Sequence, residues 1–267
     1  MDLNLAGRTA VITGGTMGIG KAIAEALAAE GANLVLIART QETLNEVAES
    51  IRSNSGVKVL AQATNITDSE LVNATAEAAV EMFGTINILV NNAGHRMRRF
   101  DRQILWDDAD WQADIDAKTV GMLRVIRAFV RHLAKDGSGR IINISGVAAK
   151  IVWESALTHG LNNAAMNHVT GYLARDLAAD QITVNAIVPG LVGTEWRQGW
   201  AGMMAEKQGK TKEQFLADYC EQFGILSGRW ASPEEIADLV TFVASDRGKY
   251  INGAQLVIDG GLNVNAR

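Results

Sequence analysis

The segment Thr13-Gly14-Gly15-Thr16-Met17-Gly18-Ile19-Gly20 decides the fold of this 267-residue chain. It follows a short apolar run, Thr9–Ile12, and precedes a segment of helical periodicity, Lys21–Glu30. Glycines at such a strand-to-helix turn let the backbone bend tightly and approach a pyrophosphate, while the helix N-terminus supplies amide donors. The segment therefore predicts a dinucleotide site at the first turn of a βαβ unit, although a glycine loop alone is equally typical of a plain tight turn.

The same alternation of strand and helix continues along the chain. The predicted strands are Thr9–Ile12, Leu34–Ile37, Lys58–Ala61, Ile86–Val90, Arg140–Ile144, Thr183–Val188 and Gln255–Ile258. The predicted helices are Lys21–Glu30, Gln41–Ile51, Asp68–Met82, Asp110–Leu133, Leu161–Ala179 and Pro233–Ala244, the last with Ser232 as N-cap. Most of the strands are apolar without alternation, as expected for a sheet covered on both faces. The pattern predicts a single α/β domain over residues 1–267, with a Rossmann-like, doubly wound parallel sheet of about seven strands.

Composition excludes several classes of protein. The net charge of −5 argues against nucleic acid as the main partner. The lone cysteine, Cys220, cannot form an internal disulfide, which favours a reducing, cytoplasmic location. No apolar run approaches the ~18 residues of a membrane span, and Met1–Asn4 lacks the basic start of a secretion signal. We expect no membrane span, and no metal site is predicted.

Four motifs together resemble the short-chain dehydrogenase/reductase family. The loop has that family's glycine spacing, and Asn91-Asn92-Ala93-Gly94 follows the fourth predicted strand. Pro189-Gly190 with Thr194, and Asp259-Gly260-Gly261 near the end, match two further family segments. The resemblance covers essentially the whole chain. It implies a nicotinamide cofactor bound by Gly14, Thr16, Met17, Gly18, Ile19, Gly20, Arg39, Asn65, Ile66, Asn92, Ala93, Gly94, Pro189, Gly190, Val192 and Thr194.

The end of the second strand bears on the choice of nicotinamide. An acidic residue there would bind the ribose 2′-hydroxyl of NAD and repel a 2′-phosphate, but the chain has Ala38 and Arg39. Arginine is a bidentate partner for phosphate, so NADP(H) is favoured over NAD(H). Two observations weaken this preference: Arg39 could be a solvated residue at a helix entry, and Met17 stands where NADP-type relatives often carry a basic residue.

The catalytic positions of the family are all replaced. The family uses Asn, Ser, Tyr and Lys, and these positions fall on Lys118, Gly146, His159 and Asn163, with Ser145 adjacent to Gly146. Compared with the family, a lysine (Lys118) stands at the asparagine position and an asparagine (Asn163) stands at the lysine position. His159 can donate or accept a proton near neutral pH, and a nearby Lys118 would depress its pKa. The predicted catalytic residues are therefore His159, Lys118, Ser145 and Asn163. The alternative is that the protein has lost catalysis. In that case His159 would be a loop histidine with its hydrogen bonds satisfied, and Lys118 would be solvated.

Two segments are candidates for contact with substrate. A basic cluster follows the fourth strand, comprising His95, Arg96, Arg98, Arg99 and Arg102. It could recruit an anion, or it could be a solvated edge or a subunit contact. The insertion Glu195–Leu226, rich in Trp and Met, lies where the family places a mobile lid, and Trp196 would face the substrate from it. Trp153 and Glu154 are further wall candidates. We expect a small-molecule substrate with an apolar part, and the basic cluster would suit an anionic one.

These observations favour an NADP(H)-dependent oxidoreductase that acts on a carbonyl or secondary alcohol, with His159 in place of tyrosine. A non-redox lyase, isomerase or dehydratase on the same scaffold is the second hypothesis, and a non-catalytic nicotinamide-binding partner is the third. The resemblance also implies a homotetramer, with a dimer as the next expectation, built through the helices Asp110–Leu133 and Leu161–Ala179 and the last strand.

Overall fold

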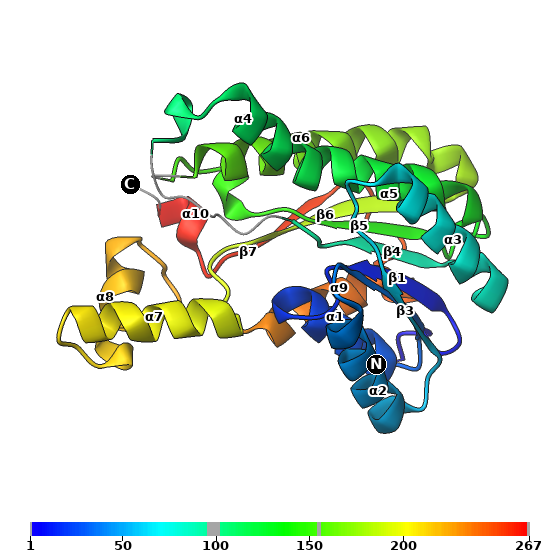
Figure 1. Cartoon of the computed structure of the whole chain (residues 1–267), viewed down its shortest axis with the longest axis horizontal. Helices are drawn as coiled ribbons and strands as arrows, with labels where there is room; N and C mark the ends of the chain where they lie inside the picture. The colour runs from blue at the N-terminus through cyan, green and yellow to red at the C-terminus, as the bar shows by residue number, and fades with distance from the viewer. Residues whose placement is uncertain (1, 95–101, 154–155, 266–267) are drawn as a thin grey trace.

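The computed structural model describes residues 2–94, 102–153 and 156–265. Seven parallel strands form one sheet in the order β3-β2-β1-β4-β5-β6-β7 (Figure 1). Their bounds are β1 Thr9–Thr13, β2 Asn33–Ala38, β3 Val59–Ala63, β4 Ile88–Asn91, β5 Arg140–Ile144, β6 Thr183–Pro189 and β7 Gln255–Ile258. The doubly wound α/β fold predicted from the alternation is confirmed, because every predicted strand is present and all of them run parallel.

Helices cover both faces of the sheet. The main helices are α1 Gly18–Ala29, α2 Gln41–Ser55, α3 Ser69–Phe83, α4 Asp108–Ile115, α5 Gly121–Phe129, α6 Leu157–Asp176 and α9 Pro233–Ala244. Apolar residues of α1, α2 and α9 form one core with the strands. Those of α3, α5 and α6 form a second core on the opposite face (Figure 1). This double burial explains the continuously apolar strands. No helix of the described part of the chain is long and apolar enough to cross a membrane.

One predicted helix is interrupted. The periodicity predicts a single helix over Asp110–Leu133, but α4 and α5 are joined by a π-helical turn, η2 (Asp116–Val120). An ion pair of 2.6 Å links Asp116, the first residue of this turn, to Arg124 on α5. Turns of this kind are frequent at functional sites because they redirect single side chains. Here the redirected residue is Lys118, which is buried.

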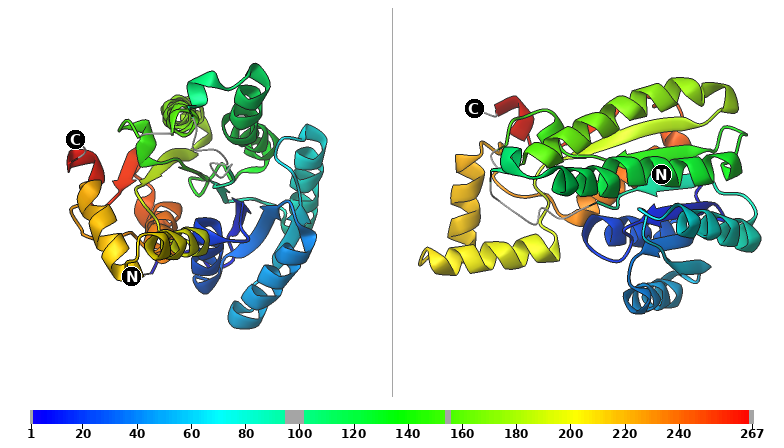
Figure 2. Two further views of the ribbon diagram at one scale, coloured as in Figure 1. Left: turned by 60° about the vertical axis from the view of Figure 1, so that its left-hand side comes forward. Right: turned by 45° about the horizontal axis from the view of Figure 1, so that its top comes forward.

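The insertion before α9 folds into two helices that the sequence did not predict. These helices, α7 (Glu195–Lys207) and α8 (Lys212–Gln222), lie at one end of the molecule beyond the sheet (Figure 2). Both helices contribute to a third apolar cluster, through Ala201 and Ala205 of α7 and Phe215 and Cys220 of α8. The boundaries of α9 follow the predicted signal, because Ser232 and Glu235 form a reciprocal capping box with proline at the helix start.

The sheet order reverses between β1 and β4. In open parallel sheets, ligands bind outside the carboxyl ends of the strands at this switch point. A buried chain of side-chain hydrogen bonds runs here, from Asn91 Nδ2 to Asn143 Oδ1 and from Asn143 Nδ2 to Thr170 Oγ1, each at 2.9 Å. It ties β4, β5 and the later half of α6 together, so α6 is held against this part of the sheet.

Candidate active site

A cleft of about 1410 Å³ lies at the switch point. It exceeds the ~300–1,000 Å³ of an ordinary small-molecule pocket, so it has room for a dinucleotide and a second molecule. Fifteen of the sixteen predicted cofactor residues line it. Gly20 is the exception. A Cβ at Gly20 would stand 2.1 Å from the Gly14 carbonyl oxygen, so its role is to let helix and loop meet.

The glycine loop fits a pyrophosphate. Gly14 and Gly18 have φ values of +68° and +53°, a region that favours glycine. No side-chain hydrogen bond caps α1 at Met17, where Ser or Asp commonly would. Gly18 and Ile19, the first residues of α1, line the cleft, so the positive end of the helix dipole lies beside it, as an anionic group requires.

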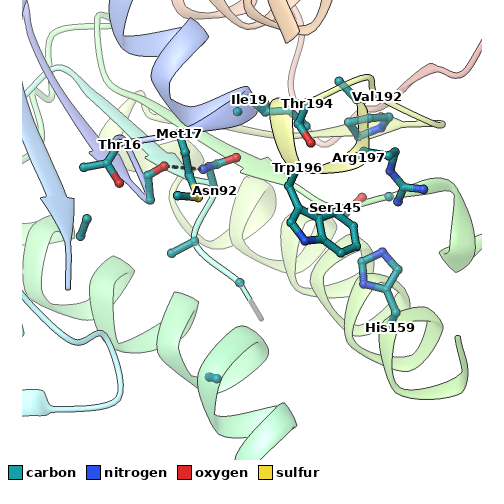
Figure 3. A pocket seen from close by; sticks show the side chains of 18 of the residues that line it. Thr16, Met17, Ile19, Asn92, Ser145, His159, Val192, Thr194, Trp196 and Arg197 are labelled. Carbon is teal, nitrogen blue, oxygen red and sulfur yellow. Dashed lines mark hydrogen bonds between the residues drawn. The ribbon is translucent and has the colours of Figure 1, made fainter. Parts of the chain in front are cut away.

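Thr13 and Asn92 hold this loop in place. Thr13 Oγ1 accepts hydrogen bonds of 3.0 Å from the amides of Asn92 and Ala93. Asn92 Nδ2 in turn donates to the Thr13 and Gly14 carbonyls, each at 3.1 Å. Figure 3 shows Asn92 beside the glycine loop, near Thr16 and Met17. The Asn91–Gly94 motif thus fixes the loop as well as lining the cleft.

The cleft also extends along the end of β2, where its lining could bind a phosphate. Ala38 ends β2, and Arg39, Thr40 and Thr43 follow it along the cleft wall. Arg39 is exposed, and no described carboxylate lies within ion-pair distance of it. A basic side chain with two neighbouring hydroxyls matches the donor set that a ribose 2′-phosphate needs.

The four predicted catalytic residues converge but do not all reach the cleft. His159, in the first turn of α6, lines it, and so does Ser145, which follows β5. Ser145 Oγ donates a long hydrogen bond of 3.4 Å to the Ile187 carbonyl. Lys118 and Asn163 lie behind the wall: Asn163 is fully buried and Lys118 is 8% exposed. Lys118 does not line the cleft, so any effect of its charge on a bound molecule would act across the wall rather than by contact.

Lys118 and Asn163 contact each other. Lys118 Nζ donates to Asn163 Oδ1 at 2.6 Å, so the exchanged ammonium and amide meet between η2 and α6. The aliphatic stem of Lys118 lies close to Gly94, where a Cβ would stand 3.5 Å from its Cδ. Burial lowers the pKa of Lys118 to about 8, opposed only by the Asp114 carboxylate. Lys118 is therefore a buried cation that titrates close to physiological pH.

His159 is held neutral. The Lys118 charge, then burial, then the Arg197 charge lower the pKa of His159 to about 3. The direction and the leading cause are those expected from the sequence. A neutral imidazole carries one N–H donor and one acceptor nitrogen, so it can relay a proton through the ring. It does not supply a standing imidazolium at neutral pH.

Gly146 explains why the family's serine is absent. A Cβ at this position would stand 2.8 Å from Asn163 Nδ2 and 3.5 Å from His159 Nε2. The asparagine amide therefore occupies the space that a serine side chain needs. Asn163 Nδ2 has no hydrogen-bond partner among the described residues. A buried, unsatisfied donor costs about 1–3 kcal/mol, so this amide is held in place at the expense of stability.

The predicted substrate residues divide into three groups. Trp153 and Trp196 line the cleft. His95, Arg96, Arg98, Arg99 and Glu154 lie outside the described residues. Arg102 faces a separate hollow of about 720 Å³, so it does not serve this cleft. Within the described ranges, no group of three His, Cys, Asp or Glu side chains is placed to hold a metal ion.

Sequence reasoning missed Arg197, which lines the cleft from the first turn of α7. Its charge also lowers the pKa of His159, after the larger effects of Lys118 and of burial. The available signal was its place three residues after Thr194 and next to Trp196, at the start of a segment expected to shape specificity.

Comparison with known proteins gives matches over nearly the whole chain. A family model described as Enoyl-(Acyl carrier protein) reductase matches residues 14–263. The chain is 33% identical over 263 residues to the 3-oxoacyl-acyl-carrier-protein reductase FabG of Aquifex aeolicus, covering 98% of this chain and 100% of that protein. The structure of L-sorbose reductase from Gluconobacter frateurii, complexed with NADPH and L-sorbose, is similar at a TM-score of 0.91 and 33% identity, over 98% and 99% of the two chains. A short-chain dehydrogenase/reductase from Serratia marcescens is similar at 0.85 and 31%, over 97% and 99%.

The substitution Thr13→Val tests the anchor of the glycine loop. It removes the acceptor of two amides at constant shape, so we expect a loss of about 1–3 kcal/mol in unfolding free energy and weaker NADPH binding. Thr183→Val is the matched control, since the buried Thr183 hydroxyl has no hydrogen-bond partner among the described residues and its loss should be nearly neutral. Urea unfolding and calorimetric titration measure both variants. Equal stabilities would show that Thr13 is not an anchor.

The substitution Lys118→Met tests the buried cation. The pKa of Lys118 is about 8 in the folded chain against 10.5 for an ordinary lysine, so the unfolded state binds more protons between these values. Stability should therefore rise with pH across this window, by about 3 kcal/mol in total. Lys118→Met should lose this rise, whereas Lys207→Met, at an exposed position on α7, should keep it. Urea unfolding at pH 7.5, 9 and 10.5 gives the comparison, and parallel pH profiles of wild type and Lys118→Met would contradict the assignment.

Proposed function

The chain belongs to the short-chain dehydrogenase/reductase family of NAD(P)-dependent oxidoreductases, and we propose that it interconverts a carbonyl and a secondary alcohol with NADP(H), using His159 where the family uses tyrosine. The observation that carries the proposal is that His159 lines the same cleft as the glycine loop and the segment Pro189–Thr194. A proton-relaying side chain and a complete cofactor cradle thus share one cavity.

The cofactor would be held along the carboxyl edge of the sheet. The α1 N-terminus and glycine loop would hold the pyrophosphate, Arg39 the 2′-phosphate, and Asn65 and Ile66 the adenine. The Pro189–Thr194 segment would hold the nicotinamide end. When bound, NADPH supplies the hydride that a carbonyl carbon accepts during reduction. The preference for NADP(H) rests on Arg39 and on the lack of an acidic residue at the end of β2.

His159 would complete the reaction on the substrate oxygen. Reduction of a carbonyl adds a hydride to carbon and a proton to oxygen. Because the imidazole is neutral, we assign it the role of relay: one ring nitrogen donates its proton to the oxygen while the other takes one from water in the open cleft. In the direction of alcohol oxidation the relay runs backwards, and the proton leaves to solvent.

Lys118 and Asn163 would act from behind the wall. The Lys118 ammonium favours negative charge developing on the nearby substrate oxygen without touching it. Asn163 orients the ammonium through its Oδ1. Both are positioning residues. Ser145, at the edge of the cleft, can supply a further hydroxyl.

The role of His159 predicts a loss of turnover without a loss of cofactor. In His159→Gln, NADPH oxidation with a panel of ketones and aldehydes should fall roughly 100- to 10,000-fold in kcat, while NADPH binding remains unchanged. His168→Gln, at an exposed position on the same helix, should match wild type. Full activity in His159→Gln would falsify the assignment. Cofactor that is bound but never consumed by wild type would favour the non-redox or non-catalytic hypotheses instead.

The substitution Arg39→Ala tests the nicotinamide preference. The loss of a charge-assisted contact to the 2′-phosphate, typically about 1.5–3 kcal/mol, should weaken NADPH binding roughly 10- to 150-fold. NADH lacks this phosphate, so its affinity should change little, and it serves as the control within the same variant. Fluorescence titration of both nucleotides measures the effect. A parallel loss for NADH, or wild-type preference for NADH, would overturn the assignment of NADP(H).

A further inference from the structure

Arg197 occupies the substrate end of the cleft. It lies in the first turn of α7, directly after the segment expected to hold the nicotinamide. Figure 3 shows Arg197 and His159 on the same side of the cleft, with Trp196 and Ser145 beside them, whereas Thr16 and Met17 of the glycine loop lie at the other side. Arg197 is therefore placed to meet a substrate rather than the pyrophosphate.

Arg197 differs from other poorly exposed arginines in having no carboxylate partner among the residues that the structure describes. Arg8 and Arg124 each pair with an aspartate at 2.6 Å, and Arg140 has two carbonyls within 2.9 Å and Asp246 at 4.0 Å. Arg197, itself half-buried, makes no ion pair with any described residue. Its guanidinium instead lies 5.8 Å from the centre of the Trp230 ring. Partial burial of a cation without a counter-ion costs free energy, and an anionic ligand would offset that cost.

The walls around Arg197 are aromatic. Trp153 stacks on Phe223 with ring centres 4.9 Å apart, and Trp200 meets Tyr219 edge-on at 5.8 Å. All four rings line the cleft. The four rings pack in pairs, which fixes their positions. Together they form an apolar surface in the same cleft as the Arg197 guanidinium and the neutral His159 imidazole. Such a surface favours an aryl or alkyl group attached to an anion.

We propose that Arg197 binds the carboxylate of the substrate, and that the substrate is an oxo acid, or the matching hydroxy acid, with an aromatic or long alkyl group. The inference rests on the proposed function, since His159 then faces the carbonyl or hydroxyl oxygen of the same molecule. The guanidinium forms a planar fork that matches both carboxylate oxygens. The aromatic walls enclose the apolar group.

Binding of a probe that cannot react separates this inference from the proposed function. The probes are 3-phenylpropanoate and its neutral analogue 3-phenylpropanamide, titrated calorimetrically into the full chain saturated with NADP+. We expect wild type to prefer the carboxylate at least tenfold. Arg197→Met should abolish this preference, and Arg197→Lys should retain part of it, because the charge remains and the fork is lost. Lys207→Met, which removes a charge from an exposed site on the same helix, should behave as wild type.

Other outcomes overturn the inference. Equal binding of acid and amide by wild type would show that the cleft does not select a carboxylate. Weaker NADPH binding in Arg197→Met with unchanged acid preference would assign Arg197 to the cofactor. Displacement of 3-phenylpropanoate by inorganic phosphate at comparable concentration would assign the site to phosphate esters instead. If acid selectivity is found but no oxo acid is reduced, the carboxylate site stands and the proposed redox chemistry fails.

Discussion

The ammonium of Lys118, buried with one amide oxygen as its hydrogen-bond partner, is the constraint on which the catalytic half of the structure depends. A buried cation needs a fixed acceptor, and Asn163 supplies it from the neighbouring helix. The amide that meets this need also occupies the space beside residue 146, so only glycine fits there. The same charge is the largest cause of the lowered pKa of His159. Lys118, Asn163, Gly146 and His159 are therefore coupled to one another by contact and by charge.

The cofactor half is governed by backbone geometry. Thr13 and Asn92 hold the glycine loop at the carboxyl ends of β1 and β4, and Gly190 approaches Asp259 so closely that a Cβ would stand 2.7 Å from its Cα. Each contact allows little change in residue type, because carbonyl oxygens or a neighbouring backbone fill the space. The contacts that hold the glycine loop do not involve the contact between Lys118 and Asn163. Substitutions at one of these two places need not disturb the other.

The electrostatics of the cleft follow from this arrangement. Lys118 behind the wall and Arg197 on α7 place two positive charges around a neutral imidazole, in a chain whose net charge is −5. Cations held in a partly enclosed space favour an anionic ligand and an oxygen that gains negative charge during reaction. Because burial lowers the pKa of Lys118 to about 8, the inner charge is present at neutral pH and fades in alkaline solution.

The sequence by itself determined the seven strands and their parallel sheet. Of the residues it predicted to bind the cofactor, all but Gly20 line the cleft. Each of these depends on local signals: apolar runs, glycine spacing and short motifs at strand ends. It also predicted that His159, Lys118, Gly146 and Asn163 lie together, and the structure places Asn163 next to the other three. Only the tertiary structure decided that Lys118 and Asn163 touch behind the wall, because a π-helical turn, invisible to helical periodicity, redirects the lysine. Only the tertiary structure placed Arg197 in the same cleft as His159, because α7 and α8 share an apolar cluster with residues distant in the chain, among them Val147 and Leu262.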